Sequence, residues 1–373
     1  MEFSSSEEQQ LLADALTRFV AREYSFEKRR QFLRSPEGFS REAWRALADL
    51  GVLGMAFAEE YGGVGGGPVE TMLVASALGS ALVVEPYLAT VVLAGGLVDS
   101  RGSEAQKRAL LPGIAQGELL LALAHDEPGH RYEGSRVAAR AERSGSSWRV
   151  TGEKSIVLHG AQADKLVVSA RVGAERGLAL FLVDRKASGV RARDYRTLDG
   201  LRAAEISFDG AAAEPLGSES DARDAVERAT DAGVAALCAE AVGAMQALNA
   251  QTLEYIKNRQ QFGQPIGRFQ VNQHKAVDMM IHFEQSKSMA YFAAMHVASK
   301  DTRARRRAVS AAKAYIGKSA RFVAETAIQL HGGMGVTDEL PASHYAKRLV
   351  MIDFQLGDAS HHLDRFLADA ERE

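Results

Sequence analysis

The residue pattern of this chain changes twice, and the order of the three patterns limits the folds that it can adopt. From about residue 5 to residue 118, apolar residues such as Leu12 and Leu16 recur at helical spacing. Between about residues 119 and 214, short apolar runs bounded by Gly or Asp are typical of strands. Long helical patterns return from about residue 221 to the end. We therefore predict an α+β chain with an N-terminal helical domain (1–118), a central β-barrel or sandwich domain (119–220) and a C-terminal bundle of long helices (221–373).

The predicted elements are short in the middle of the chain and long towards its end. We predict strands at 147–150, 165–170, 178–183 and 204–208, and short strands at this spacing favour a compact barrel or sandwich. The C-terminal pattern predicts helices at 234–258, 290–299 and 305–330. Because these helices contain few aromatic residues, we expect close helix-on-helix packing and an oligomer interface in this domain.

Composition excludes several classes of protein. A net charge of −3 over 373 residues gives no reason to expect nucleic acid or an anionic membrane as a partner. The single cysteine, Cys238, excludes an intrachain disulfide framework and a Cys-rich metal site. Residues 1–4 lack the basic and apolar regions of a signal peptide, and no apolar stretch reaches the roughly 20 residues of a membrane span. We therefore expect a cytoplasmic protein without a membrane partner.

Five motifs along the chain together resemble those of the acyl-CoA dehydrogenase family over its whole length. The most specific is Arg-Gln-Gln-Phe-Gly-Gln-Pro-Ile-Gly-Arg-Phe-Gln at 259–270. The others are Glu60-Tyr61-Gly62-Gly63, Asp126-Glu127-Pro128, Gly152-Glu153-Lys154 and Gln-Leu-His-Gly-Gly-Met-Gly at 329–335. This resemblance implies the family's three-domain fold, FAD as cofactor, and α,β-dehydrogenation of an acyl-CoA thioester, as in fatty acid metabolism. In that reaction a glutamate takes the α-proton and the flavin takes the β-hydride.

The resemblance also implies that the catalytic base is missing. The family places its glutamate at one of two positions, and these align here with Leu356 and Gly233, neither of which can accept a proton. Glu240, Asp353 and Asp358 lie near these positions in sequence and remain alternatives as a base. We therefore predict no catalytic residue in this chain.

The flavin contacts that the family implies divide into two groups. In the family each FAD lies across a subunit interface, and the residues that a subunit donates to its neighbour's FAD are retained here. The retained cofactor-binding set is Arg259, Gln261, Phe262, Ile266, Gln270, Gln329, Gly332 and Gly333. The positions that hold the flavin ring depart from the family: Asp126 replaces a threonine, Ile156-Val157-Leu158 replaces Trp-Ile-Thr, and Asp358 replaces another threonine.

These departures predict a small, non-catalytic subunit of a heteromeric, α2β2-type acyl-CoA dehydrogenase. The stretch from Phe57 to Met72 further resembles the small subunit of pimeloyl-CoA dehydrogenases. The implied partners are a paralogous large subunit, the acyl-CoA substrate and electron-transferring flavoprotein. Two alternatives stay open: a homo-oligomeric flavoenzyme that uses Asp358 or Glu240 as base, and a non-enzymatic protein that binds acyl-CoA. We expect no metal site, and we interpret His361-His362 as a solvated or interface pair.

Overall fold

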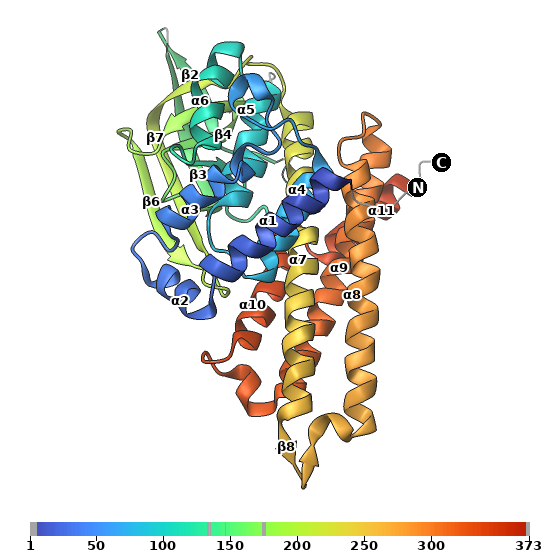
Figure 1. Cartoon of the computed structure of the whole chain (residues 1–373). Coiled ribbons are helices and arrows are strands. Elements are labelled where there is room, and N and C mark those ends of the chain that lie inside the picture. Colours follow the sequence, from blue (N-terminus) through green and yellow to red (C-terminus); the bar gives the residue numbers. More distant parts are fainter. Residues whose placement is uncertain (1–5, 133, 135, 146, 174–176, 371–373) are drawn as a thin grey trace. The chain divides into compact units, whose positions relative to one another are not determined.

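The computed structural model describes residues 6–132, 134, 136–145, 147–173 and 177–370 (Figure 1). Residues 1–4, on which the expected absence of a signal peptide rests, lie outside this part of the chain. The chain divides into two compact units. The first contains residues 1–31, 68–83 and 234–373, and the second contains residues 32–67 and 84–233. The N-terminal helices thus contribute to both units, and the three-domain division remains a prediction.

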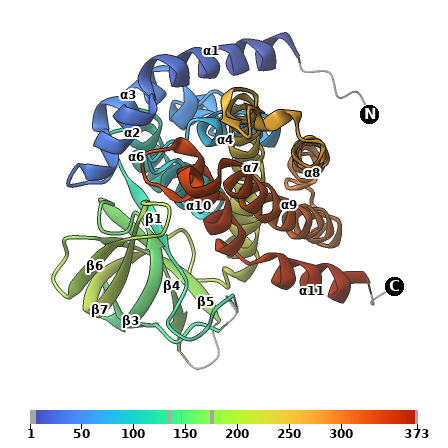
Figure 2. The ribbon, with the colours of Figure 1, turned by 90° about the horizontal axis from the view of Figure 1, so that it is seen from below.

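The second unit contains a β-sheet preceded by short helices. The helices are α3 (Arg41–Asp49), η1 (Val52–Gly54), η2 (Glu59–Tyr61), the π-helix η3 (Tyr87–Gly95), α5 (Gly96–Arg101) and α6 (Glu104–Ala115). The strands are β1 (Leu121–Ala124), β2 (Arg140–Ser144), β3 (Ser147–Leu158), β4 (Lys165–Val172), β5 (Leu178–Asp184), β6 (Val190–Arg196) and β7 (Arg202–Pro215). Their curved arrangement is seen in Figure 2.

Five of the strands close into a ring, which makes this sheet a barrel. β4 pairs with β2, β2 with β3, β3 with β7, β7 with β5, and β5 returns to β4. β1 and β6 extend the ring by pairing with β4 and β7. The core is apolar, with Phe181, Val150 and Val168 fully buried. Closure removes most exposed strand edges, which suits a small β-domain.

The first unit is a bundle of helices. It contains α1 (Glu7–Glu23), the start of α2 (Phe26–Arg34), α4 (Pro68–Ser80), residues 234–258 of α7 (Arg223–Asn258), α8 (Gln270–His296), α9 (Thr302–His331), α10 (Pro341–Phe354) and α11 (Ala359–Ala370). A capping box at Ser6 begins α1. Gly79 of α4 lies against the backbone of Glu240, and Gly243 of α7 lies against the backbone of Ser76. These two glycines explain how α4 and α7 pack closely without aromatic side chains.

Several element boundaries differ from the sequence prediction. The predicted helix at 290–299 is only the end of α8, and β1, β2 and β6 were not predicted. β2 and β6 are mostly polar and exposed, so they lack the apolar alternation that identifies a strand. One helix in the described part of the chain, α7, is long and apolar enough to span a membrane, but 78% of its apolar window is buried in the protein.

Candidate functional site

The retained cofactor motif at 259–270 forms a hairpin and a turn at one end of the helical bundle (Figure 1). After α7 ends at Asn258, β8 (Gln260–Gln261) pairs with β9 (Gln264–Pro265). Phe262 and Gly263 connect them, with φ angles of +54° and +78°, as a tight hairpin turn requires. Phe262 is 91% exposed, an unusual position for a large apolar side chain held in a left-handed conformation. The Phe262 ring therefore extends into solvent, where it makes an edge-on contact with Phe269.

Backbone and side-chain hydrogen bonds fix the segment that follows the hairpin. The N–H of Ile266 donates to the carbonyl of Arg259 at 2.8 Å. The 3-10 turn η4 (Ile266–Arg268) leads into α8, where the Asn272 side chain donates to the carbonyl of Ile266 at 2.8 Å. Arg259 and Gln270 are exposed, and Ile266 is half-buried. The polar side chains of the motif are therefore accessible from outside the chain.

The second retained motif lies at the same end of the bundle. α9 ends at His331, and the Tyr255 hydroxyl of α7 donates to the His331 carbonyl at 3.3 Å, which links the two motifs. The 3-10 turn η5 (Gly332–Val336) begins with Gly332 at φ +61°. A Cβ atom on Gly333 would meet no protein atom within 4 Å. Gln329 and both glycines are exposed. The structure thus brings all eight predicted cofactor residues to one end of one unit.

The loop at the predicted base position is held by buried side chains. Leu356 has a φ of +56° and is half-buried. The ammonium of Lys313, on α9, is fully buried, and its three N–H groups are shared among the carbonyls of Ile352, Asp353, Gln355 and Gly357, whose oxygens lie 2.6–3.0 Å from Nζ. Burial lowers the pKa of Lys313 to about 8, so the ammonium remains mostly charged at neutral pH. This cation satisfies carbonyls that the C-terminus of α10 would otherwise leave unpaired.

The three carboxylates weighed as a base each have a structural contact. Glu240 accepts two hydrogen bonds from Arg348, at 2.5 and 2.7 Å. Asp353 accepts the backbone N–H of Ala359 at 3.1 Å. Asp358 precedes α11 and accepts the N–H of His361 at 2.9 Å, as a helix N-cap does. These contacts give each carboxylate a role in packing or capping.

The interpretation of His361-His362 as a solvated or interface pair is wrong for His362. This side chain is 1% exposed, and its Nε2–H donates to the Leu356 carbonyl at 2.9 Å while Nδ1 lies 3.3 Å from the Ser310 hydroxyl. Burial lowers its pKa to about 3. His361 is half-buried beside it. The described residues contain no group of three or more His, Cys, Asp or Glu side chains arranged to hold a metal ion.

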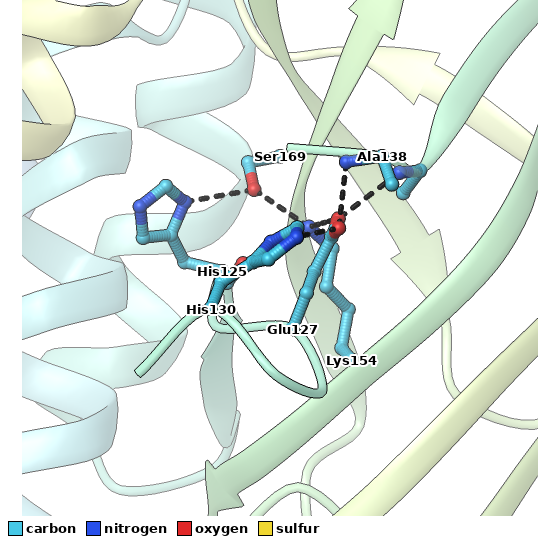
Figure 3. A network of polar contacts seen from close by, with 7 residues as sticks. His125, Glu127, His130, Ala138, Lys154 and Ser169 are labelled. Carbon is cyan, nitrogen blue, oxygen red and sulfur yellow. Dashed lines mark hydrogen bonds and ion pairs between the residues drawn. The ribbon is translucent and has the colours of Figure 1, made fainter. Parts of the chain in front are cut away.

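Inside the barrel unit, two of the sequence motifs meet in one buried network (Figure 3). The Lys154 ammonium donates to Glu127 Oε1 at 2.7 Å, and also to the His125 carbonyl and the Ser169 hydroxyl, both at 3.0 Å. The Glu127 carboxylate also accepts the N–H groups of Ala138 and Ala139. Burial raises the pKa of Glu127, but Lys154 and the two N–H groups outweigh it and lower the pKa overall. Glu127 of the first motif is therefore the counter-ion of Lys154 of the second motif.

His125 extends this network, and sequence reasoning did not identify its role. Its Nδ1 lies 2.8 Å from the Ser169 hydroxyl, and burial lowers its pKa to about 4. Its neighbour Asp126, at a ring-holding position, is half-buried, and burial raises the pKa of its carboxyl to about 6. Asp126 is therefore still mostly ionised at pH 7, where the family has a neutral hydroxyl.

Three more of the predicted ring-holding positions, Ile156, Val157 and Leu158, lie on β3. A bulge between Lys154 and Val157 places Ile156 at φ +52°, and its side chain is 54% exposed. A left-handed conformation is costly for a β-branched residue. Val157 is buried and Leu158 is half-buried. These aliphatic side chains offer neither the aromatic ring nor the hydroxyl that the family resemblance implies here.

Comparisons with known proteins identify the family. Family models for the N-terminal, middle and C-terminal domains of acyl-CoA dehydrogenase match residues 6–118, 122–211 and 224–364. Mitochondrial isovaleryl-CoA dehydrogenase of Pongo abelii is 30% identical over 94% of this chain and 86% of its own length. The ChsE4–ChsE5 complex from Mycobacterium tuberculosis contains a chain with 28% identity, full coverage of both chains and a TM-score of 0.91. A Tcur3481–Tcur3483 steroid ACAD variant has 28% identity, 98% coverage of both chains and a TM-score of 0.89. The chain therefore belongs to the acyl-CoA dehydrogenase family of FAD-dependent oxidoreductases that act on acyl-CoA.

Proposed function

We propose that this chain is the small, non-catalytic subunit of a heteromeric acyl-CoA dehydrogenase. The proposal rests on the residues at the two positions where the family places its catalytic glutamate. Leu356 occupies one of them, and Gly233 occupies the other. The nearby carboxylates Glu240, Asp353 and Asp358 are engaged by Arg348 or by backbone N–H groups. A carboxylate that serves as an ion-pair partner or helix cap is poorly placed to accept a substrate proton.

The chain would donate the neighbour's half of an FAD site. Arg259 suits the pyrophosphate, because a guanidinium presents paired donors to anionic oxygens. Gly333 supports this role, because neither its φ angle nor the space around it requires a glycine for folding. A glycine there would let a cofactor approach the backbone closely. When bound, FAD supplies the hydride acceptor, and the side chains of this half-site bind and orient it.

The barrel of this chain is a poor site for a second flavin ring. Asp126 would place a carboxylate near the ring, and Leu158 has no hydroxyl to offer it. One competent active site per heterodimer follows, with the base and the ring contacts on a large paralogous subunit. The similar ChsE4–ChsE5 complex and Tcur3481–Tcur3483 steroid ACAD, each named for two proteins, support such a partner.

Exposed apolar side chains on α8 and η5 support contact with another subunit. Val277, Met280 and Ile281 recur at helical spacing on α8, and η5 exposes Met334 and Val336. Exposed apolar side chains at helical spacing on one side of a helix suit an interaction surface. We propose an α2β2 assembly in the cytoplasm, with an acyl-CoA of bulky or dicarboxylic chain as substrate, as the steroid-type and pimeloyl-type resemblances suggest. Electron-transferring flavoprotein is the acceptor that the family implies.

The deciding experiment is a measurement of FAD per chain. Flavin absorbance relative to protein mass is recorded for the chain alone and for the chain co-expressed with the acyl-CoA dehydrogenase encoded beside it. Little FAD alone and about one FAD per heterodimer supports the proposal. One FAD per chain in a homo-oligomer, with activity lost in Asp358→Asn or Glu240→Gln, supports the autonomous enzyme instead. Absence of FAD from every complex, together with acyl-CoA binding, supports the non-enzymatic alternative.

A further inference from the structure

Tyr255 connects the two cofactor motifs of the helical bundle. Its backbone carbonyl accepts the N–H of Arg259 at 2.8 Å, and its hydroxyl donates to the carbonyl of His331 at 3.3 Å. Arg259 begins the first motif, and His331 immediately precedes Gly332 and Gly333 of the second. One residue therefore contacts the main chain beside both groups of cofactor residues, which lie about 70 positions apart in sequence.

The His331 ring completes this connection. Its centroid lies 4.3 Å from that of the Tyr255 ring, with an interplanar angle of 30°. Its Nδ1–H donates to the carbonyl of Ala327 at 2.8 Å, because a carbonyl can only accept. The side chain is buried, and Gly335 packs so closely on it that an added Cβ would lie 2.9 Å from the Cβ of His331. The Tyr255 ring and the Ala327 carbonyl thus orient the His331 ring, and Gly335 packs against its Cβ atom.

We propose that Tyr255 and His331 are positioning residues that set the spacing between the Arg259 hairpin and the Gly332-Gly333 turn. This inference rests on the proposed cofactor half-site and assigns it two residues outside the set expected to touch FAD. The physical reason is preorganisation. A site made of two separate segments binds a ligand more weakly when the segments must first be brought into register.

The simplest test is to remove only the Tyr255 hydroxyl. Tyr255→Phe keeps the ring stack with His331 and loses the bond to its carbonyl, whereas Tyr255→Leu loses both. Tyr315→Phe is the matched control, because the Tyr315 hydroxyl also donates a hydrogen bond within the bundle, to Gln285 on α8. Each variant is co-purified with the large subunit. The dissociation constant of FAD is measured by flavin fluorescence, and the unfolding temperature of the cofactor-free chain is recorded in parallel.

We expect Tyr255→Phe to weaken FAD binding about threefold to tenfold, the range for one lost hydrogen bond, and Tyr255→Leu to weaken it further. The unfolding temperature of Tyr255→Phe should match that of Tyr315→Phe. If the Tyr255 hydroxyl served packing alone, its removal would not weaken FAD binding at an unchanged unfolding temperature. Unchanged FAD affinity in both Tyr255 variants would overturn the inference and leave the proposed function standing. A wild-type complex that binds no FAD would overturn the proposed function and the inference together.

Discussion

Arg348 on α10 and Glu240 on α7 form a two-pronged ion pair, with Nε and Nη2 lying 2.5 and 2.7 Å from the two carboxylate oxygens. The same guanidinium donates through Nη1 to the Gln355 side chain at 3.0 Å. Gln355 is buried and directly precedes Leu356. The pair therefore joins two helices and the loop at the predicted base position, and it gives Glu240 a structural role.

Replacing Glu240 with glutamine should destabilise the chain. The change leaves Arg348 buried beside a neutral side chain, and removing one partner of a buried pair costs roughly 3 kcal/mol or more. Urea denaturation of the purified chain measures the loss. Glu254→Gln is the control, because Glu254 lies on the same helix in an exposed pair with Lys257, where the loss should stay below about 0.5 kcal/mol. Equal effects of the two substitutions would contradict the structural role of Glu240.

Two glycines of η5 should respond in opposite ways to alanine. A Cβ on Gly335 would lie 2.8 Å from the Ile328 carbonyl, so Gly335→Ala should lower the unfolding temperature. A Cβ on Gly333 meets no protein atom, so Gly333→Ala should fold normally and yet reduce FAD in the co-purified complex at least tenfold. Thermal unfolding and flavin absorbance separate the two effects. Full FAD content in Gly333→Ala would remove this residue from the cofactor set.

Lys313 should control the order of residues 352–358, from the end of α10 to the start of α11. Lys313→Met removes the donor of four carbonyls, and the expected loss of stability is roughly 3 kcal/mol or more. Amide hydrogen exchange should become faster at Ala359 and His361, whose N–H groups donate to Asp353 and Asp358. Lys318→Met, on the exposed side of α9, is the control and should change neither quantity. Unchanged exchange in Lys313→Met would show that the loop is held by other contacts.

The sequence predicted a central β domain, as a barrel or sandwich, and long C-terminal helices, because these depend on local patterns. The motif at 259–270 is contiguous, so its residues needed no knowledge of the fold to be grouped. The same reasoning placed Asp126-Glu127-Pro128 and Gly152-Glu153-Lys154 as separate motifs. It did not show that Glu127 and Lys154 are partners, because strand register decides which side chains meet.

The sequence did not reveal the contacts of Lys313 and Arg348, for a related reason. Lys313 contacts carbonyls 39–44 positions away, and Arg348 contacts Glu240 across 108 positions. Every residue has a backbone carbonyl, so the residue type does not reveal which carbonyls accept a hydrogen bond from Lys313. The local sign was a single lysine with Val309, Ile316 and Ala320 beside it at helical spacing. Such a lysine is either exposed or holds buried acceptors, and only the packing of α9 against α10 distinguishes the two.

Stability should fall in mild acid because His362 is buried in its neutral form. Its pKa is about 3 in the folded chain, against an ordinary value of 6.5. Between these values the unfolded chain binds a proton that the folded chain does not, so the free energy of unfolding decreases as the pH falls below 6.5. Well above pH 6.5, His362 is neutral in both the folded and the unfolded chain, so it no longer changes the free energy of unfolding with pH.

His362→Gln isolates this contribution. Glutamine does not titrate, and its amide can still donate to the Leu356 carbonyl that His362 Nε2 contacts. From pH 6 to pH 4 the wild-type chain should lose up to about 1.4 kcal/mol per pH unit more than the variant. Urea denaturation at half-unit steps of pH measures the difference, and at pH 8 the pH dependence of the two chains should be the same. Parallel curves across the acid range would mean that His362 is protonated within the folded bundle, in conflict with its burial between Ser310 and Leu356.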